Sequence, residues 1–415
     1  MKTKSEVIVI GAGIVGLSSA YYLAKAGHSV IVLEKTDGSD SCSYGNAGLI
    51  APSHFVPMSS PGIMAKGLRW MLSPDSPFFV KPRLSLPLAK WGWQFMQHST
   101  HKHVDETKKL LADLSIISLE LHQEFAADEE VRLDNKGILM HCLTDACLKN
   151  EIELANMATD LGLPTKILDI DELNAIDPAI RHEGAGAVLF PGDSYMEPKA
   201  FMEKMKESLR ELNVETYYNQ EVVDFEKSNG KISKIRTTDS EFEADDVVLA
   251  TGSYTAPLLK LVGEQMLLEP GKGYSVDWHD SPVMPDLAYI LLEARVAITP
   301  MNNFVRLAGT MELNGLDLSV NPRRVAGFLK SIEDYLPDFN YEKVKSLPVW
   351  AGLRPCSPDG LPYVGKDSKI KNLTIAAGHS MLGFTLGPVT GKLVAEIISG
   401  EQTSLNIDQL AVDRY

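Results

Sequence analysis

The first 35 residues contain two unbroken apolar runs separated by a stretch of mixed composition. Residues 7–10 (VIVI) are all apolar, which is typical of a strand buried on both faces of a parallel sheet. A helix is predicted over residues 14–26, because it would end at Gly27 and glycine commonly caps helices. Residues 28–33 predict a second strand. This order predicts the start of an α/β domain with a parallel sheet.

The spacing of apolar residues changes several times along the rest of the chain. Residues 107–130 carry apolar positions at helical spacing with charges between them, which predicts an amphipathic helix. Residues 198–212 predict another helix, and short strands with an antiparallel hairpin follow from residue 214. Residues 267–315 contain further strand-like runs, and residues 322–336 are helical in pattern. Parallel and antiparallel pairing are therefore both expected.

Three glycines stand between the first strand and the first helix. Gly11, Gly13 and Gly16 fall on the G-x-G-x-x-G spacing. The first permits a tight turn, the second lets the backbone approach a pyrophosphate, and the third lets helix and strand pack closely. Glu34 ends the second strand about 20 residues further on, where a carboxylate can bond ribose hydroxyls. The stretch predicts a dinucleotide site, for either NAD or FAD.

A second strand, glycine loop and helix lie near the other end of the chain. The strand reads LTIAAGH, and the helix reads PVTGKLVAEIISG, with Pro388 expected near its first turn and Gly400 at its end. NAD is normally held by one doubly wound domain, whereas FAD in one class of flavoenzymes spans an N-terminal and a C-terminal unit. An extended cofactor held at both ends therefore favours FAD, with an NAD-linked dehydrogenase as the alternative.

Length and charge limit the other function classes. A chain of 415 residues exceeds one hydrophobic core and predicts two domains. The net charge of −15 argues against nucleic acid, whose phosphates require clustered Lys and Arg. Four cysteines are too few for a disulfide framework and suit a reducing compartment. His141, Cys142 and Cys147 lack a second ligand pair at zinc spacing, so no metal site is predicted.

The expected location is the cytoplasm. The first strand begins within six residues of Met1, which leaves no room for a signal peptide, and no apolar run is long enough to span a bilayer. Residues 57–96 combine prolines and basic residues with six aromatic side chains: Trp70, Phe78, Phe79, Trp91, Trp93 and Phe95. This stretch could contact the inner face of the cytoplasmic membrane or a partner, although packing within the second domain is favoured as the simpler explanation.

Five segments together resemble the D-amino acid oxidase superfamily of FAD-dependent oxidoreductases. They are the fingerprint at 11–34, SYGNAGLIAP at 43–52, VVLATG at 247–252, WAGLRPCSPDGLPYVG at 350–365 and AAGHSMLGFTLGPVTGKLVAEII at 376–398. Within it, the chain is most similar to the small subunit of bacterial D-amino acid dehydrogenase and to hydroxyproline dehydrogenases, and more distantly to glycine oxidase. The similarity covers nearly the whole chain, and the two ends are its most specific parts.

The resemblance implies an α/β (α+β) fold, in which a Rossmann-like FAD-binding domain is interleaved with a mixed-sheet substrate domain. Residues 1–60, 185–265 and 345–415 are expected to bind FAD. Residues 61–184 and 266–344 are expected to form the substrate domain, whose sheet would cover the flavin.

The resemblance also implies how FAD is held. Glu34 would bond the adenosine ribose, and Val222 would contact adenine through its backbone. Residues 47–49 would lie along the edge of the flavin, and residues 378–385 would cover its N1 side, where backbone amides suit a developing negative charge. Relatives of the sarcosine oxidase type tether flavin through a cysteine, but that position falls near Gly352, so non-covalent FAD is predicted. The implied cofactor residues are Gly11, Gly13, Ile14, Val15, Gly16, Glu34, Lys35, Ala47, Gly48, Leu49, Val222, Thr251, Gly252, Gly378, Met381, Leu382, Gly383 and Thr385.

Four residues are candidates for contact with the substrate. Arg354 matches the position that binds the substrate carboxylate in glycine oxidase-like relatives, and a guanidinium can grip a carboxylate with two hydrogen bonds. The alternative is a structural arginine paired with Asp359. Tyr274 would approach from the covering sheet, or else be an ordinary strand tyrosine. His54 and His379 lie in loops expected to border the flavin, where a structural hydrogen-bonding role is the alternative.

The implied reaction is oxidative deamination of a D-amino acid, or oxidation of a cyclic imino acid such as D-proline or hydroxyproline. A hydride would pass from the substrate Cα to flavin N5, and water would hydrolyse the imine to a keto acid when the nitrogen is primary. A cyclic secondary amine would instead yield a cyclic imine. No dedicated base is required if the neutral amine binds.

Electrons are expected to pass to a quinone or another non-oxygen acceptor, since the resemblance is to dehydrogenases. Two alternatives stay open: a glycine- or sarcosine-type amine oxidase that uses oxygen, and the flavin subunit of a multi-subunit electron-transfer complex. An oligomer or hetero-oligomer is compatible with both. The substrate side chain and the oligomeric state do not follow from the sequence.

Overall fold

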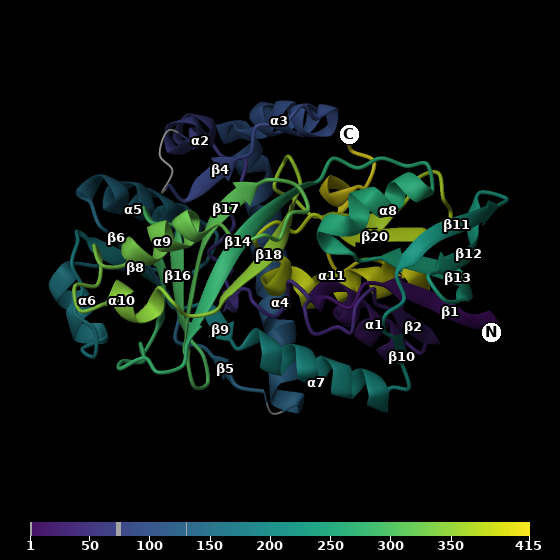
Figure 1. Ribbon diagram of the computed structural model, residues 1–415, viewed down its shortest axis with the longest axis horizontal. Coiled ribbons are helices and arrows are strands. Elements are labelled where there is room, and N and C mark those ends of the chain that lie inside the picture. Colours follow the sequence, from purple (N-terminus) through teal and green to yellow (C-terminus); the bar gives the residue numbers. More distant parts are fainter. Residues whose placement is uncertain (1, 72–75, 130) are drawn as a thin grey trace.

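The computed structural model of this chain describes residues 2–71, 76–129 and 131–415. Two large sheets lie side by side in it, with helices around and between them (Figure 1). The chain crosses from one sheet to the other several times, so neither sheet is built from one continuous segment.

The eight-stranded sheet has a parallel centre. The apolar run at residues 7–10 pairs with residues 30–33 on one side and with residues 246–249 on the other. Both faces of this run are buried, as its composition predicts. The parallel strands, in spatial order, are β10 (Glu215–Tyr217), β2 (Val30–Leu33), β1 (Lys2–Ile10), β13 (Glu241–Leu249) and β20 (Leu373–Ala377). The antiparallel strands are β11 (Val222–Ser228), β12 (Lys231–Thr237) and β19 (Tyr363–Lys366).

Two helices meet through glycines beside this sheet. α1 (Ile14–Lys25) follows β1, and α11 (Gly383–Ser399) lies against it (Figure 1). A Cβ atom at Gly387 or Gly391 would lie closer than 3.0 Å to atoms of α1, so the helices approach this closely only because α11 has glycine there. The other helices near this sheet are α4 (His101–Asp128), α7 (Pro198–Glu211), α8 (Thr255–Leu261) and the 3₁₀ turn η1 (Gly252–Tyr254).

The nine-stranded sheet is mixed. Most neighbouring strands run antiparallel, but β15 pairs parallel with β6 and β4 pairs parallel with β17. The strands are, in spatial order, β18 (Val349–Cys356), β14 (Glu269–Trp278), β17 (Val305–Leu313), β16 (Val296–Pro300), β15 (Ala288–Leu291), β6 (Ile138–Cys142), β8 (Gly186–Phe190) and β7 (Lys166–Leu168), with β4 (Phe78–Val80) beside β17. One apolar core lies between this sheet and α6 (Ile170–Ile176), α9 (Pro322–Lys330) and α10 (Tyr341–Val344). α4 and α5 (Asp145–Asp160) contribute to a different core.

A short sheet and two helices complete the described fold. The short antiparallel sheet consists of β3 (Leu49–Ile50), β9 (Ser194–Met196) and β5 (Leu133–Asp134). Two helices, α2 (Ile63–Met71) and α3 (Leu86–His98), lie with β4 along the upper edge of the molecule in Figure 1. The 3₁₀ turn η2 (Asp408–Leu410) is near the C-terminus.

The predicted α/β (α+β) class, with a Rossmann-like sheet and a mixed sheet, is confirmed. The helix predicted over residues 107–130 corresponds to α4, with residue 130 outside the described part. Pro388 was expected near the first turn of its helix, but α11 begins five residues earlier, at Gly383, and Pro388 lies inside it. Phe384 and Leu386 are buried, and this packing offsets the hydrogen bond that a proline inside a helix cannot donate.

Strand pairing does not follow the order of the chain in two places. β8 and β18 belong to the nine-stranded sheet, although the expected domain ranges assign residues 185–265 and 345–415 to the FAD domain. Both strands pair with neighbours distant in sequence, which their own composition does not reveal. The consequence for the site is that β18 carries Arg354 within the mixed sheet.

Candidate functional site

The turn between β1 and α1 has the geometry that its glycines predict. Gly11 has a φ of +103°, and a Cβ atom there would lie 2.6 Å from the oxygen of Ala250. A Cβ atom at Gly16 would collide with the oxygen of Gly11, so strand and helix require both glycines. A Cβ atom at Gly13 would make only an ordinary contact, at 3.4 Å from Ser43 Oγ. The protein's own packing therefore does not require Gly13, whereas close approach of a pyrophosphate would.

Glu34 lies at the carboxyl end of β2, beside the glycine turn. Its Oε2 accepts a hydrogen bond from the amide of Ala12 at 2.7 Å. The amide of Gln220 donates to the main-chain oxygen of Glu34 at 2.8 Å, which brings the start of β11 and Val222 to the same end of the sheet. The side chain of Lys35 forms a surface ion pair with Glu221. The structure therefore brings Glu34 and Val222 to the same end of the sheet, and the partner of the Lys35 ammonium, Glu221, is the residue before Val222.

A loop between the two sheets has an unusual set of hydrogen bonds. Six consecutive main-chain oxygens, those of residues 44–49, each accept a hydrogen bond from another part of the chain. Arg306 donates to the oxygens of residues 44 and 46, at 2.8 and 2.9 Å. Ser275 and Thr299 donate to those of residues 45 and 47, at 2.9 and 2.8 Å. The nine-stranded sheet thus holds four of the six oxygens.

The other two oxygens of this loop are bound from different elements. The amide of Met196 donates to Gly48 at 2.9 Å, and the hydroxyl of Thr385 donates to Leu49 at 3.1 Å. The amides of residues 45–47 have no hydrogen-bond partner within the described ranges. Since these amides have no partner of their own in the protein, they are available to a ligand.

The second glycine loop joins β20 to α11. Gly378 has a φ of +79°, which favours glycine, and Ser380 has a φ of +51°. The amide of Ser380 donates to the oxygen of Pro355 at 2.9 Å and so ties the loop to β18. Leu382 precedes α11 without a side-chain cap, and such a helix start favours negative charge. Met381 is 55% exposed in this loop.

These elements fit FAD. The starts of α1 and α11 and the free amides of residues 45–47 gather near the carboxyl ends of β1, β2 and β20, where open α/β sheets bind ligands. Ile14 and Val15 form the first turn of α1, and the amide of Ile14 donates to Ser43 Oγ at 2.9 Å. Thr251 and Gly252 follow β13, and Gly252 has a φ of +54°.

Arg354 has no carboxylate partner among the residues that the structure describes. Its Nη1 donates to the main-chain oxygen of Thr310 at 2.9 Å, and burial lowers the pKa of the guanidinium. Thr310 has a φ of +63°, an uncommon conformation for a residue with a side chain. Asp359 is bound by Arg414, whose Nε and Nη2 donate at 2.7 and 3.1 Å. The alternative that Arg354 pairs with Asp359 is therefore wrong.

Glycines lie against the side chains of Arg354 and Trp350. Arg354, Gly352 and Trp350 share one face of β18, because alternate residues of a strand point the same way. A Cβ atom at Gly273, opposite Gly352 on β14, would collide with the guanidinium. A Cβ atom at Gly45 or Gly352 would collide with the ring of Trp350. This face therefore meets the loop of residues 44–49, with the guanidinium and an aromatic ring close to the backbone.

Tyr274 lies on the opposite face of β14. Its neighbour Gly273 faces the guanidinium, and successive side chains of a strand point to opposite faces. The hydroxyl of Tyr274 donates to Glu312 at 2.6 Å and accepts from the amide of Asn321 at 3.1 Å. The ring packs in the core beside α9. These contacts place Tyr274 away from the guanidinium and support the alternative of an ordinary strand tyrosine. The strand is buried on both faces, so its composition did not show which face meets the guanidinium.

His379 is buried and His54 is half-buried, and both are neutral at neutral pH. Burial lowers the pKa of each to about 4, and repulsion by Arg295 contributes for His54. Nε2 of His379 is 2.9 Å from Thr390 Oγ1 on α11. Nδ1 of His54 is 3.4 Å from Ser53 Oγ. No hydrogen bond joins either ring to Arg354 among the described residues, so the structural alternative has more support for both histidines.

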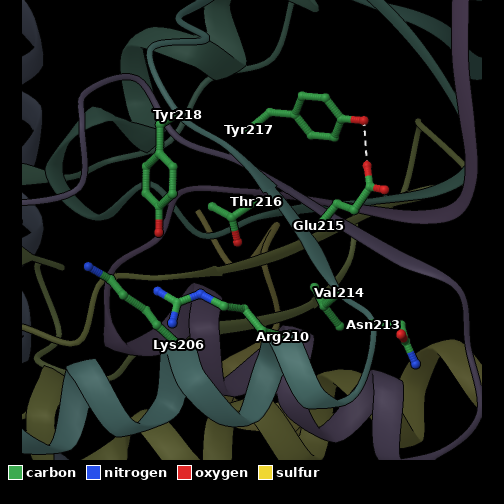
Figure 2. A pocket seen from close by; sticks show the side chains of 8 residues that line it. All are labelled: Lys206, Arg210, Asn213, Val214, Glu215, Thr216, Tyr217 and Tyr218. Atoms are coloured by element: carbon green, nitrogen blue, oxygen red, sulfur yellow. Dashed lines mark hydrogen bonds between the residues drawn. The ribbon is translucent and has the colours of Figure 1, made fainter.

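An open cleft of about 540 Å³ lies between α7 and the edge strand β10 (Figure 2). Its lining consists of Lys206, Arg210, Asn213 and residues 214–218. Lys206 also donates to the oxygen of Gly38 at 3.3 Å. None of the predicted cofactor or substrate residues lines this cleft, although the amide of Glu34 donates to the oxygen of its lining residue Tyr217 at 2.9 Å.

Four polar residues of the site were not predicted. Arg306, Ser275 and Thr299 bind the oxygens of the 44–49 loop, and Thr310 binds Arg354. Arg306 also forms a two-bond ion pair with Asp277, at 2.7 and 2.8 Å. The sequence offered one signal for Arg306, because this arginine lies within an apolar run and a buried arginine requires partners. Nothing in the sequence marked the other three.

The described residues contain neither a cluster of metal-ligating side chains nor a helix suited to a membrane. They contain no group of three or more His, Cys, Asp or Glu side chains placed to hold a metal ion. His141 instead has Nε2 at 2.9 Å from the oxygen of Glu183, and Cys142 is buried. In the same ranges, no helix combines the length and apolar character needed to cross a membrane.

Comparison with known proteins agrees with this geometry. The model of the family described as FAD dependent oxidoreductase matches residues 6–397. The D-amino acid dehydrogenase of Vibrio atlanticus is 32% identical over 424 residues, which cover 99% of this chain and 100% of that protein. The D-amino acid dehydrogenase of Helicobacter pylori is 31% identical over 407 residues, which cover 98% of this chain and 97% of that protein.

Solved structures with the same fold include enzymes of other names. Glycine oxidase from Geobacillus kaustophilus superposes with a TM-score of 0.80 at 23% identity, covering 100% of both chains. L-proline dehydrogenase from P. horikoshii superposes with a TM-score of 0.73 at 21% identity, covering 99% of this chain and 97% of that chain. At this identity the likeness supports the fold alone.

Proposed function

Since this chain belongs to the FAD dependent oxidoreductase family, we propose that it oxidises the Cα–N bond of a D-amino acid, or of a cyclic imino acid such as D-proline or hydroxyproline. The observation that carries the proposal is Arg354, a half-buried guanidinium with no carboxylate partner in the described chain, on the face that meets the loop of residues 44–49. The D-amino acid dehydrogenases among the relatives support the choice of substrate class.

In this proposal Arg354 binds the substrate carboxylate. A planar guanidinium can donate two parallel hydrogen bonds to a carboxylate and thereby fix its orientation. The oxygen of Thr310 holds one end of the guanidinium, and Gly273 lets it lie close to β14. Trp350 forms a wall on the same face. The substrate Cα hydrogen would then point toward the flavin edge beside residues 45–47.

The proposed cofactor contacts use backbone more than side chains. The α1 turn at Gly13 would hold the pyrophosphate, Glu34 the adenosine ribose and Val222 the adenine. The amides of residues 45–47 would face the flavin edge. The start of α11 would stabilise negative charge at the N1 side. Bound FAD would accept the hydride at N5, and we infer that it is held without a covalent bond.

The strand pairing refines the proposed domains. The FAD domain would comprise residues 1–60, 185–265 and 345–415, without β8 and β18. The substrate domain would comprise residues 61–184 and 266–344 with those two strands. The active site would then lie where the mixed sheet meets the loop of residues 44–49.

The proposed electron acceptor is a quinone or another non-oxygen acceptor. The support is indirect: the Vibrio and Helicobacter relatives, each more than 30% identical, are named dehydrogenases. Reduced enzyme should then react slowly with oxygen and faster with a quinone analogue or a dye. Rapid stoichiometric release of peroxide would instead identify an oxidase.

The proposal is tested by mixing the purified flavoprotein with substrates in the absence of oxygen. The panel contains D- and L-amino acids, both prolines, hydroxyprolines, glycine and sarcosine, and the readout is loss of the visible flavin absorbance. Reduction by D-amino acids or D-proline is expected. If glycine and sarcosine alone reduce the flavin, the substrate class is wrong. If no compound reduces it, the proposal fails for the isolated chain, and a further subunit would be required.

A further inference from the structure

Exposed apolar side chains are concentrated on one edge of the molecule. Among the described residues, sixteen large apolar side chains are exposed, and eight of them lie within residues 64–96 and 316–320. Leu84 is fully exposed, Leu86 is 70% exposed and Trp93 is 57% exposed. We call these eight side chains the apolar surface: Met64, Leu84, Leu86, Trp93, Met96, Leu316, Leu318 and Val320. Half of the exposed large apolar side chains of the described residues therefore lie on these two segments.

The two segments lie side by side. β4 pairs parallel with the end of β17, so both chains leave the sheet in the same direction. The amide of Lys81 donates to the oxygen of Leu313 at 3.1 Å, and Nη1 of Arg83 donates to the same oxygen at 3.3 Å. Arg83 also pairs with Glu269 of β14. The residues after Arg83 and those after Leu313 therefore begin from one point at the sheet edge.

α3 presents one face to the protein and the other to solvent. Trp91 and Phe95 are buried and stacked, with ring centroids 4.9 Å apart. Nε1 of Trp91 donates to the oxygen of Cys356 at 2.8 Å. Trp93 and Met96 are exposed. Figure 1 shows α3 beside α2 on the outer edge, above β4 and β17. An aromatic residue and a methionine on the outer face are not explained by packing within the chain.

The charge of this region is opposite to that of the chain. Residues 57–98 contain five basic residues and one acidic residue, in a chain with a net charge of −15. Four of the five are exposed and have no ion pair within the described ranges: Lys66, Arg69, Lys81 and Lys90. Asp317 is the acidic side chain that faces Lys81 from the other segment. The apolar surface therefore has a basic rim on an acidic protein.

We propose that the apolar surface docks on an anionic lipid bilayer. Leu84, Leu86 and Trp93 would enter the boundary between headgroups and acyl chains, and the lysines and Arg69 would contact the anionic headgroups. The acidic remainder of the molecule is repelled by the same bilayer, so only this face can bind and the orientation is determined. A symmetric dimer through this face would bring its cations together, which is unfavourable.

Docking in this orientation also bears on the electron acceptor. Trp91 ties α3 to Cys356, two residues from Arg354 on β18, so the docking helix and the proposed active site share one strand. A quinone dissolved in the bilayer would then be near the enzyme face that carries α3. This last step rests on the proposed function, whereas the docking itself does not.

The test uses the flavin-loaded protein and flotation with phosphatidylglycerol or phosphatidylcholine vesicles, without substrate. The protein should float with phosphatidylglycerol at low salt, and less at high salt or with phosphatidylcholine. The double variants Leu84→Ser/Trp93→Ser and Lys81→Glu/Lys90→Glu should each bind at least about tenfold more weakly. Their matched controls, Leu261→Ser/Val223→Ser and Lys149→Glu/Lys199→Glu, replace exposed residues elsewhere and should bind like the wild type.

Three outcomes would overturn this proposal: no flotation with phosphatidylglycerol, equal flotation of test and control variants, or a wild-type dimer that Leu84→Ser/Trp93→Ser dissociates. The last result, measured by light scattering, would assign the surface to self-association. Substrate-dependent bleaching of the flavin, measured separately in solution, reports on the proposed function. Failure of docking and failure of the enzymatic proposal are therefore distinguishable.

Discussion

The guanidinium of Arg354 lies so close to Gly273 that a Cβ atom on that glycine would occupy the position of Nη1 and its neighbours. The two residues come from adjacent antiparallel strands, β18 and β14. The oxygen of Thr310 holds the guanidinium on the side of β17. Backbone atoms of two neighbouring strands thus set the position of Arg354, the only cation that we propose to bind the substrate.

Removal of this cation should weaken substrate binding without loss of FAD. Arg354→Ala should weaken the apparent affinity by about 2–5 kcal/mol, as expected for loss of one partner of a buried charged pair. Arg354→Lys should recover only part of this, because an ammonium does not reproduce the planar fork. Anaerobic titration of the flavin spectrum measures both occupancy and affinity. An unchanged affinity in Arg354→Ala would mean that the carboxylate binds elsewhere.

Gly273→Ala should displace the guanidinium without removing its charge. A methyl group cannot fit beside Nη1, so we expect a higher KM for amino acid with FAD occupancy retained. Gly92→Ala is the matched control, since a Cβ atom at Gly92 meets nothing within 4 Å. If both variants bind substrate equally well, the contact between Arg354 and Gly273 does not control binding.

The loop of residues 44–49 offers a test of cofactor positioning through Arg306. Arg306→Met leaves Asp277 and two main-chain oxygens without their donor, and should lower both the melting temperature and flavin retention. Arg306→Met/Asp277→Leu removes the unpaired carboxylate and should recover the melting temperature but not flavin retention or the flavin reduction potential.

Two controls separate these effects. Arg306→Lys should restore part of the retention, because one donor can still reach the loop. Arg236→Lys changes an arginine in an exposed ion-pair cluster of β12 and should have no effect on the flavin. If the double variant recovers both stability and flavin retention, Arg306 has a structural role only.

Gly13 and Gly16 should respond differently to substitution, although both belong to the fingerprint. Gly16→Ala places a methyl group against the oxygen of Gly11 and should prevent folding or severely destabilise the protein. Gly13→Val places its side chain near Ser43 at an ordinary contact distance, so it should fold and purify colourless. Circular dichroism and the visible spectrum distinguish the two. A yellow Gly13→Val protein with full occupancy would contradict the proposed pyrophosphate position.

Acid should destabilise the protein partly through His379. Burial lowers its pKa to about 4 in the folded state, from an ordinary value of 6.5. The unfolded state therefore binds a proton first as the pH falls, so this stabilisation is complete above pH 6.5 and is lost between pH 6.5 and about 4. The full effect is on the order of 3 kcal/mol.

His379→Gln can keep a donor for Thr390 but cannot titrate, so its stability should fall less steeply with acid. Urea unfolding at several pH values measures the slope. His101→Gln, on the exposed start of α4, should retain the wild-type slope. Equal slopes for both variants would show that His379 does not contribute to the acid destabilisation. If His379→Gln lost substrate-dependent flavin reduction, the ring would have a role in catalysis after all.

The sequence by itself determined the features that depend on neighbouring residues. The glycine spacing of residues 11–16 is a local steric requirement, since Gly16 must pass the oxygen of Gly11 in the same turn. The apolar run of residues 7–10 similarly requires a strand covered on both faces. Together with the second glycine loop, these local rules were sufficient for the fold class and for FAD, and the family comparison agrees with both.

The tertiary structure decided which partner each polar residue takes. Asp359 lies five residues from Arg354 but binds Arg414, because the last turn of the chain returns to it. Tyr274 and Gly273 are neighbours, yet only Gly273 faces the guanidinium. A strand buried on both faces has no alternation of polar and apolar residues, so its sequence does not show which residues face the site. Arg306 reaches a loop more than two hundred residues away in sequence. Such contacts form only when segments distant in sequence meet, so no local pattern encodes them.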